Sequence, residues 1–283
     1  MTLLEGKPIA KQLSEKLKII VERLIETTNT TPKLVAVNLG DDSASEWYNR
    51  SIEKACGKVG IDYELYTQEN KSLKEASELI KELNNDNSVH GILINQPLPK
   101  ELHGVIEWIA PEKDIEGATA VNLGRLLLQQ KTHIPCTPRA VMTIIDEYHI
   151  DLTGLKVCML GRSNIVGKPL SLLLTERNGT VTLCHSKTKV LEKELLSSDV
   201  IVVAIGKAHY VKAEWVKNDA VIIDVGTNYT DNGLVGDVDF ESVKEKASMI
   251  TPVPGGVGSL TNVMLLENCI EAFQQQVSME HSL

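Results

Sequence analysis

The sequence lacks the features that mark several protein classes. No C-x-x-C pair occurs among its five cysteines, so free thiols in a reducing compartment are expected rather than disulfides or a zinc site. No apolar run approaches membrane-spanning length, and the N-terminus has no basic start followed by an apolar core, which predicts a soluble cytoplasmic protein without a membrane partner. The histidines and acids show no metal-ligand spacing, so no metal is expected.

Basic residues are fewer than acidic ones, 29 against 38. The formal net charge of −9 argues against a nucleic-acid partner or an anionic membrane surface, although a local basic pocket is compatible with it. Aromatic residues make up only 4% of the chain, and Trp47, Trp108 and Trp215 have no spacing that suggests a stacking platform. With 283 residues, the chain is long enough for a large core and two domains.

The first half of the sequence alternates helical and strand patterns. Apolar residues recur at helical spacing over residues 5–28, which predicts an amphipathic helix. Further predicted strands are 34–39, 61–66 and 90–95, and further predicted helices are the segment around Tyr48 and residues 73–83. This alternation indicates a parallel sheet covered by helices.

The second half is organised around residues 156–169, KVCMLGRSNIVGKP. Its first five residues predict a buried strand, Gly161 lets the chain turn, and a leucine-rich helix follows. Arg162 and the polar residues after it supply donors, while Gly167 permits close approach of the backbone to a ligand. An anion there would meet free N–H groups and the positive end of the helix dipole. The stretch resembles a Rossmann first turn without G-x-G-x-x-G, and by itself it also fits an ordinary strand-to-helix loop.

Three more predicted strands complete this series, at residues 180–184, 199–204 and 220–225. In dinucleotide folds the end of the second strand reads the adenosine ribose, and an acid there selects NAD. Here that end is His185–Thr188, which contains no acid. Together with Arg162 it favours NADP, because a phosphate dianion calls for charge-assisted donors. The alternative interpretation of the same segment is a solvated polar loop.

A series of motifs runs along nearly the whole chain. The first half contains GDDSASEWY, PLP, PEKD and PCTP, and the second half contains GRSNIVGKP, CHSKT, VVAIGK, VIIDVGTNY, GDVDF and ITPVPGGVG. Together they resemble the bifunctional methylenetetrahydrofolate dehydrogenase/cyclohydrolase (FolD) family. The resemblance implies an α/β fold of two domains, an N-terminal α/β domain and a C-terminal Rossmann-like NAD(P)-binding domain with a cleft between them. We place the first domain at residues 1–125 plus 262–283 and the second at 126–261.

The resemblance also implies an activity, a cofactor and site residues. Members of the family oxidise 5,10-methylenetetrahydrofolate with NADP and hydrolyse the methenyl product to 10-formyltetrahydrofolate, in one-carbon metabolism and purine biosynthesis. The implied partners are tetrahydrofolate derivatives and a second copy of the chain in a homodimer. The implied cofactor-binding residues are Gly161, Arg162, Ser163, Ile165, Gly167, Ser186 and Thr227. The implied substrate-binding residues are Tyr48, Asn95, Glu116, Pro254, Gly255 and Gly256, of which Tyr48 and Asn95 are also the implied catalytic residues.

Three substrate-side positions depart from the family pattern. The lysine implied one helical turn after the tyrosine is Ile52, the active-site glutamine is Asn95, and the pterin-binding aspartate is Glu116. Lys54 and Arg50 each lie two positions from Ile52, which is about 200° around a helix, so neither takes over without rearrangement. The folate side is therefore changed where the cofactor side is nearly whole.

These departures affect the two activities unequally. Hydride transfer leaves a cation that the folate nitrogens stabilise, so it chiefly needs orientation and a dry site. Hydrolysis needs an activated water and proton transfer, and loss of the group that supplies them costs about 10²–10⁴-fold. We therefore expect dehydrogenase activity to survive and cyclohydrolase activity to be weakened or lost. Two alternatives stay open, namely an oxidoreductase acting on a related pterin or one-carbon substrate, and a catalytically silent folate- or NADP-binding paralogue.

Overall fold

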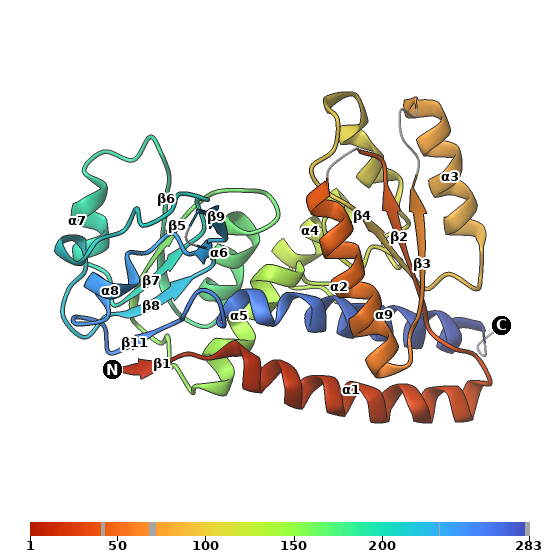
Figure 1. Cartoon of the computed structure of the whole chain (residues 1–283), viewed down its shortest axis with the longest axis horizontal. Helices are drawn as coiled ribbons and strands as arrows, with labels where there is room; N and C mark the ends of the chain where they lie inside the picture. The colour runs from red at the N-terminus through yellow and green to blue at the C-terminus, as the bar shows by residue number, and fades with distance from the viewer. Residues whose placement is uncertain (41–42, 68–71, 232, 281–283) are drawn as a thin grey trace. The chain divides into compact units, whose positions relative to one another are not determined.

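The computed structural model (Figure 1) describes residues 1–40, 43–67, 72–231 and 233–280. The chain forms two compact units, each of which is completed by a terminal segment. Unit 1 consists of residues 1–11 and 135–261, and unit 2 consists of residues 12–134 and 262–283. This division differs from the expected domain boundaries at two places, because residues 1–11 belong to unit 1 and residues 126–134 belong to unit 2.

Unit 1 is built on a six-stranded sheet whose strand pairs are all parallel. In spatial order the strands are β1 (Thr2–Leu3), β11 (Met249–Ile250), β8 (Val221–Asp224), β7 (Val200–Val203), β5 (Lys156–Leu160) and β6 (Thr180–Cys184). The pairing of β1 with β11 is what joins the first residues of the chain to this unit. All four residues of β7 are buried, which explains its uninterrupted apolar sequence.

The strand order of unit 1 reverses at β5. The chain runs from β5 through α6 (Gly167–Glu176) to its neighbour β6, and then through α7 (Leu191–Leu196) to β7 on the other side of β5. In α/β proteins such a switch point opens a crevice at the carboxyl ends of the strands, where ligands bind. The remaining elements of unit 1 are α5 (Cys136–Glu147), η2 (Ala213–Trp215), the hairpin β9 (Asn228–Thr230) and β10 (Gly233–Val235), α8 (Phe240–Val243) and η3 (Val257–Ser259).

Unit 2 contains a three-stranded parallel sheet in the order β3 (Asp62–Thr67), β2 (Lys33–Asn38) and β4 (Gly91–Ile94). The central strand β2 and strand β4 are almost fully buried, whereas the edge strand β3 is largely exposed or half-buried. The helices of the unit are α1 (Gly6–Thr28), which begins in unit 1, α2 (Ser43–Val59), α3 (Leu73–Asn85), η1 (Lys100–Trp108), α4 (Ala120–Leu127) and α9 (Thr261–Glu280).

Helix α3 has well-defined ends. Ser72 and Glu75 form a capping box at its start, in which the Glu75 carboxylate accepts from the Ser72 backbone N–H at 2.9 Å. At its other end the buried ammonium of Lys113 donates to three carbonyl groups at 2.8–3.1 Å, those of Leu83, Asn84 and Asp86. A cation at this position complements the negative end of the helix dipole. The lysine of the PEKD motif is therefore a structural cap.

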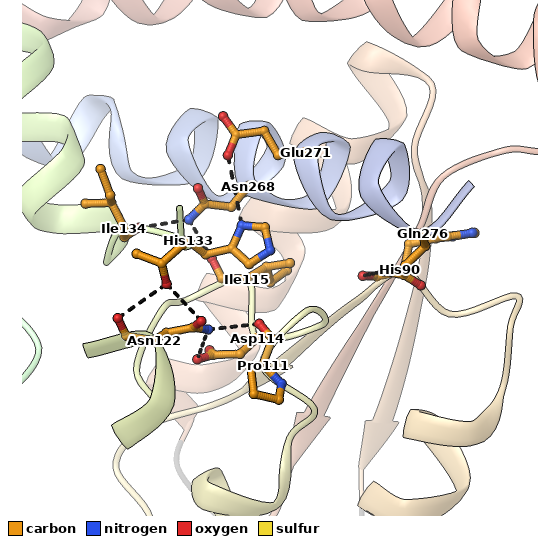
Figure 2. A network of polar contacts seen from close by, with 11 residues as sticks. His90, Pro111, Asp114, Ile115, Asn122, His133, Ile134, Asn268, Glu271 and Gln276 are labelled. Atoms are coloured by element: carbon orange, nitrogen blue, oxygen red, sulfur yellow. Dashed lines mark hydrogen bonds and ion pairs between the residues drawn. The ribbon is translucent and has the colours of Figure 1, made fainter. Parts of the chain in front are cut away.

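Figure 2 shows how α9 is tied to unit 2, although it follows unit 1 in the sequence. The amide of Asn268 is fully buried, and its Nδ2 donates to the carbonyls of Ile115 at 2.7 Å and Ile134 at 2.9 Å. Farther along the helix, Gln276 Nε2 donates to the His90 carbonyl at 2.9 Å. These bonds hold α9 to the backbone at Ile115 and Ile134, near the polar network of Asp114, and at His90, just before β4 (Figure 2).

Candidate functional site

The turn after β5 is held tight by two glycines. Gly161 has a φ of 130°, and a Cβ added to it would lie 2.2 Å from the Ala204 carbonyl oxygen. A Cβ on Gly167 would lie 2.1 Å from the Gly161 carbonyl oxygen. No side chain fits at either position. The sequence suggested that Gly167 permits close approach to a ligand, and the structure adds a reason internal to the chain, the packing of the helix start against the turn.

The other residues of this turn divide into a bonded and an exposed set. The Ser163 hydroxyl accepts from the backbone N–H of Val166 at 3.1 Å and of Gly167 at 3.4 Å, so it is bonded to the backbone where α6 begins. Arg162 and Ile165 are exposed, with Ile165 at 50%. A guanidinium group therefore lies free for a ligand beside the positive end of a helix dipole, which is a suitable setting for a phosphate group.

The segment after β6 forms an ordered turn. The backbone N–H of His185 donates to the Thr188 hydroxyl at 2.9 Å, and His185 Nδ1 accepts from the Lys187 backbone N–H at 3.1 Å. Ser186 and Lys187 are exposed at its tip. A hydroxyl and an ammonium are therefore presented at the carboxyl end of the second strand of the series, and no carboxylate belongs to this turn.

Strand β8 ends in a buried carboxylate. Asp224 is 3% exposed and accepts from the backbone N–H groups of Gly226 at 2.8 Å, Asp237 at 3.0 Å and Val238 at 2.8 Å. Burial raises the pKa of Asp224 to about 6, in spite of these three donors. Thr227 follows Gly226 and is exposed, so its hydroxyl lies free at the carboxyl edge of the sheet.

The glycine-rich loop after β11 also belongs to unit 1. The Gly255 carbonyl accepts from the Gly6 backbone N–H at 2.8 Å, and the Gly256 N–H donates to the Pro252 carbonyl at 2.7 Å. Pro254 is exposed and follows a cis peptide bond. Of the six expected substrate-binding residues, this loop carries Pro254, Gly255 and Gly256, and unit 2 carries the other three.

In unit 2, helix α2 carries Tyr48 and Ile52 on one face. Tyr48 is half-buried, whereas Ile52, where the resemblance implies a lysine, is fully buried. Lys54 is exposed, and Arg50 is exposed and pairs with Glu46 at 3.3 Å. Neither cation therefore replaces a charge at position 52.

Asn95 follows β4 and is paired with a residue that the sequence did not single out. Its Nδ2 donates to Asn49 Oδ1 at 2.8 Å, and both side chains are 3% exposed. The pair is incomplete, because the buried Asn49 Nδ2 and Asn95 Oδ1 have no hydrogen-bond partner among the residues that the structure describes. Turning over both amides would still leave one donor and one acceptor unbonded. Asn49 directly follows Tyr48, so the pair lies beside the face of α2 that carries Ile52.

The loop that carries Glu116 is organised by Asp114 (Figure 2). The buried Asp114 carboxylate accepts from the backbone N–H groups of Ala118 at 3.2 Å and Thr119 at 2.8 Å, and from Asn122 Nδ2 at 2.9 Å. Glu116 is half-buried. Desolvation, with a smaller contribution from the Asp114 charge, raises the pKa of Glu116 to about 7. Its carboxyl group therefore changes charge within the physiological pH range.

Two kinds of feature are absent from residues 1–40, 43–67, 72–231 and 233–280. In that part of the chain no helix is long and apolar enough to cross a membrane. It also contains no group of three or more His, Cys, Asp or Glu that could hold a metal ion. Asp41 and Asp42 of the GDDSASEWY motif lie outside the described residues.

The fold and the turn after β5 define a class of protein. A parallel sheet whose order reverses at a tight glycine turn is a Rossmann-like dinucleotide-binding domain, so the chain is a two-domain α/β protein with such a domain as unit 1. Residues 135–277 match the family model described as tetrahydrofolate dehydrogenase/cyclohydrolase, NAD(P)-binding domain, and residues 4–116 match the catalytic domain of the same name. The chain belongs to the tetrahydrofolate dehydrogenase/cyclohydrolase family, which confirms the resemblance and the fold class expected from the sequence.

Individual relatives match over almost the whole chain. It is 47% identical to the bifunctional protein FolD of Oceanobacillus iheyensis over 275 residues, 96% of each chain. The structure of the bifunctional FolD enzyme from Campylobacter jejuni superposes with a TM-score of 0.94 at 40% identity, covering 97% of this chain and 99% of that one. The Trypanosoma brucei dehydrogenase-cyclohydrolase, solved with NADP and an inhibitor, superposes with a TM-score of 0.93 at 32% identity over 98% of both chains.

Proposed function

We propose that this protein is an NADP-dependent 5,10-methylenetetrahydrofolate dehydrogenase whose methenyltetrahydrofolate cyclohydrolase activity is weak or absent. It acts in folate one-carbon metabolism in the cytoplasm, as a homodimer. The observation that carries the proposal is the contrast between a complete dinucleotide turn in unit 1 and the buried, uncharged Ile52 in unit 2.

The residues of unit 1 suit the binding of a dinucleotide phosphate. The turn before α6 offers the positive end of the helix dipole to the pyrophosphate, and Arg162 lies exposed in the same turn. The turn after β6 offers Ser186 and Lys187 to a 2′-phosphate and contains no carboxylate that would select a free 2′-hydroxyl. This donor set favours NADP over NAD. The Trypanosoma brucei relative was solved with NADP, which supports the same choice.

The dehydrogenase reaction makes few chemical demands on this chain. A bound NADP would supply the acceptor for a hydride, with its electron pair, from the methylene carbon, which would leave the folate as the methenyl cation. The protein binds and orients the folate and excludes water from it. The residues we assign to this binding are Tyr48, Asn95, Glu116, Pro254, Gly255 and Gly256. In its charged form, Glu116 pairs with the donors of the pterin ring through both oxygens.

Hydrolysis of the methenyl product makes stronger demands. A water must be deprotonated as it adds to the methenyl carbon, and a proton must reach the ring nitrogen that leaves. Position 52 offers neither a base nor an acid, because Ile52 is apolar and fully buried. The adjacent groups Asn49 and Asn95 are neutral amides that do not titrate. We therefore assign a loss of about 10²–10⁴-fold to this step.

A paired assay on one preparation tests this function. NADPH formation from 5,10-methylenetetrahydrofolate is measured with NADP and with NAD, and the decay of methenyltetrahydrofolate is measured against its uncatalysed rate. We expect NADPH formation, a lower rate with NAD, and methenyl decay close to the uncatalysed rate. Methenyl decay as fast as NADPH formation would contradict the proposed loss, and equal rates with NAD and NADP would contradict the cofactor assignment.

A second candidate function is oxidation of a related pterin or one-carbon substrate. It is favoured by the incomplete Asn49–Asn95 pair, since an unbonded buried donor and acceptor leave hydrogen-bonding capacity for a ligand of different shape. Thermal shifts with NADP and with tetrahydrofolate separate the candidates, because each ligand stabilises the protein according to its affinity. A response to NADP alone favours this second candidate, and a response to neither ligand favours a catalytically silent paralogue.

A further inference from the structure

Unit 1 contains a second buried carboxylate, which the sequence analysis did not assign. Asp237 is fully buried and receives four hydrogen bonds. Its Oδ2 accepts from the backbone N–H groups of Ile205 at 2.7 Å and Gly206 at 2.9 Å. Its Oδ1 accepts from the Lys207 backbone N–H at 2.7 Å and from Asn228 Nδ2 at 2.9 Å. The donors lie in two connecting segments, the loop after β7 and the loop after β8 with the first residue of β9.

The two loops occupy one side of the switch point. Residues 205–207 follow β7, and Asn228 belongs to the segment that follows β8. Both strands lie on the side of β5 opposite β6. A dinucleotide binds across such a switch point, with its adenosine ribose at the end of the second strand, which is β6 here. The loops that Asp237 joins therefore border the nicotinamide half of the cofactor.

The surroundings of Asp237 are built for a carboxylate. A Cβ on Gly226 would lie 2.3 Å from the Asp237 carboxyl carbon, so only glycine fits beside this carboxylate. The backbone of Asp237 is fixed in turn by the Asp224 carboxylate, which accepts from its N–H at 3.0 Å. A single charged group thus determines the spacing between the loop after β7 and the turn around Thr227.

We propose that Asp237 is a positioning residue for the nicotinamide half of the bound dinucleotide. It touches no reacting atom and acts through the loop at residues 205–207 and through Asn228. The inference rests on the proposed dinucleotide site of unit 1, and it is independent of the folate chemistry. Replacement by Asn is a sharp probe, because whichever way an amide turns, its NH₂ group faces two of the four donors.

The experiment compares a whole cofactor with its adenosine fragment. The affinities of NADP and of 2′,5′-ADP are measured by calorimetry for the parent and for Asp237→Asn, together with the free energy of unfolding. We expect Asp237→Asn to weaken NADP binding by about 10- to 100-fold, as for lost hydrogen bonds to a charged group, and to leave 2′,5′-ADP binding unchanged. Equal weakening of both ligands, or of neither, would overturn the proposal.

A matched control, Asp199, lies at the amino-terminal ends of the strands of the same sheet. Asp199 precedes β7, accepts from the Lys156 backbone N–H at 2.7 Å and pairs with Lys217. Asp199→Asn should lower the free energy of unfolding without changing the affinity for either ligand. If Asp237→Asn does not fold, Asn228→Ala removes one donor, and it should weaken NADP binding by a smaller factor while sparing 2′,5′-ADP.

Failure of the proposed role of Asp237 can be told apart from failure of the proposed dehydrogenase function. No folate is present, so an inactive dehydrogenase leaves the binding test intact. If the parent binds NAD and not NADP, the NADP assignment fails, and the same comparison is made with NAD and AMP. If the parent binds no dinucleotide at all, both the cofactor site and the role of Asp237 are overturned.

Discussion

The two units treat their buried polar groups differently. Among the described residues of unit 1, the buried side-chain nitrogen and oxygen atoms all have hydrogen-bond partners, and the carboxylates of Asp224 and Asp237 receive three and four bonds. In unit 2, the Asn49–Asn95 pair leaves a donor and an acceptor unbonded. Unsatisfied buried groups lower stability, so they persist where function or divergence requires them. The contrast supports the proposal that the nucleotide site is retained and that the substrate site has changed.

The difference also separates two kinds of chemistry. Binding a dinucleotide requires fixed donors, and unit 1 retains them. Hydrolysis requires a group that exchanges protons near neutral pH, and Ile52, Asn49 and Asn95 supply none. Burial raises the pKa of Glu116, which we assign to the substrate site, to about 7. We therefore expect pH to affect folate binding more than cofactor binding.

The largest predicted effect is a pH dependence of stability that comes from one buried histidine of unit 2. His90 of unit 2 is 3% exposed, its Nδ1 accepts from the Lys33 backbone N–H at 3.0 Å, and burial lowers its pKa to about 4. Between pH 4 and pH 6.5 the unfolded chain binds more protons at this residue than the folded chain, so stability rises with pH by about 3 kcal/mol. Asp224 of unit 1, with a raised pKa, acts in the opposite direction.

The measurement is the free energy of unfolding of the parent and of His90→Asn as a function of pH. Asn keeps an acceptor near Nδ1, and the difference between the two proteins should shrink as the pH falls from 6.5 towards 4. His149→Asn, at an exposed position of unit 1, is the control. A difference that is constant over this range would show that His90 is not held neutral by the fold.

The next prediction concerns the cofactor side. Arg162→Gln should weaken NADP binding by about 10- to 100-fold, because it removes charge-assisted donors to the 2′-phosphate, and it should affect NAD much less. Arg177→Gln is a suitable control, since that guanidinium pairs with Asp146 at 2.6 Å between α5 and α6. The affinities for NADP and NAD are measured by calorimetry for the parent and both variants. Equal losses for NADP and NAD in Arg162→Gln would assign Arg162 to the pyrophosphate instead.

The third prediction concerns the substrate side. If Glu116 must be charged to pair with the pterin, tetrahydrofolate affinity should fall about tenfold for each pH unit below 7, while NADP affinity stays level. Glu116→Gln should bind folate more weakly at pH 8 and with no such slope. Calorimetric titrations from pH 5.5 to pH 8 test both points. A flat profile for the parent would place Glu116 away from the folate.

The smallest predicted effect tests the incomplete amide pair. Asn49→Leu and Asn95→Leu should each destabilise the protein by about 1–3 kcal/mol, because each leaves further polar groups unbonded. The double variant, with two apolar side chains of similar shape, should be near neutral or more stable by about 1 kcal/mol. Urea unfolding of the four proteins gives the coupling energy. Strictly additive losses would mean that the two amides do not interact, which would contradict the pairing.

Much of the fold follows from local sequence patterns. The predicted strands at 156–160 and 180–184 coincide with β5 and β6, and the helix predicted over 5–28 is α1 from Gly6 to Thr28. Apolar runs and helical spacing are local signals, so these elements could be found. The pairing of β1 with β11 could not, because two-residue strands carry no period and their partners are almost the length of the chain apart.

The residues of the candidate site also divide into those with a local sequence signal and those defined by long-range contacts. Gly161 and Gly167 could be found because the turn that needs them is local. Asp237 could not, since its backbone partners lie 30 to 32 residues away and any sequence at residues 205–207 offers the same N–H groups. Asn49 could not be found either, because helical spacing from Tyr48 points to residue 52, and the partner of Asn49 lies 46 residues farther along the chain.

The most direct test of the central claim is the rate of methenyltetrahydrofolate decay in Ile52→Lys, alone and combined with Asn95→Gln, beside the parent and Ile52→Met. Met matches the length of Lys without its charge, and NADPH formation by each protein serves as the reference. We predict decay near the uncatalysed rate for the parent and for Ile52→Met, and an increase towards the assigned 10²–10⁴-fold in the lysine variants. Rapid methenyl decay by the parent, unchanged in Ile52→Met, would contradict the account.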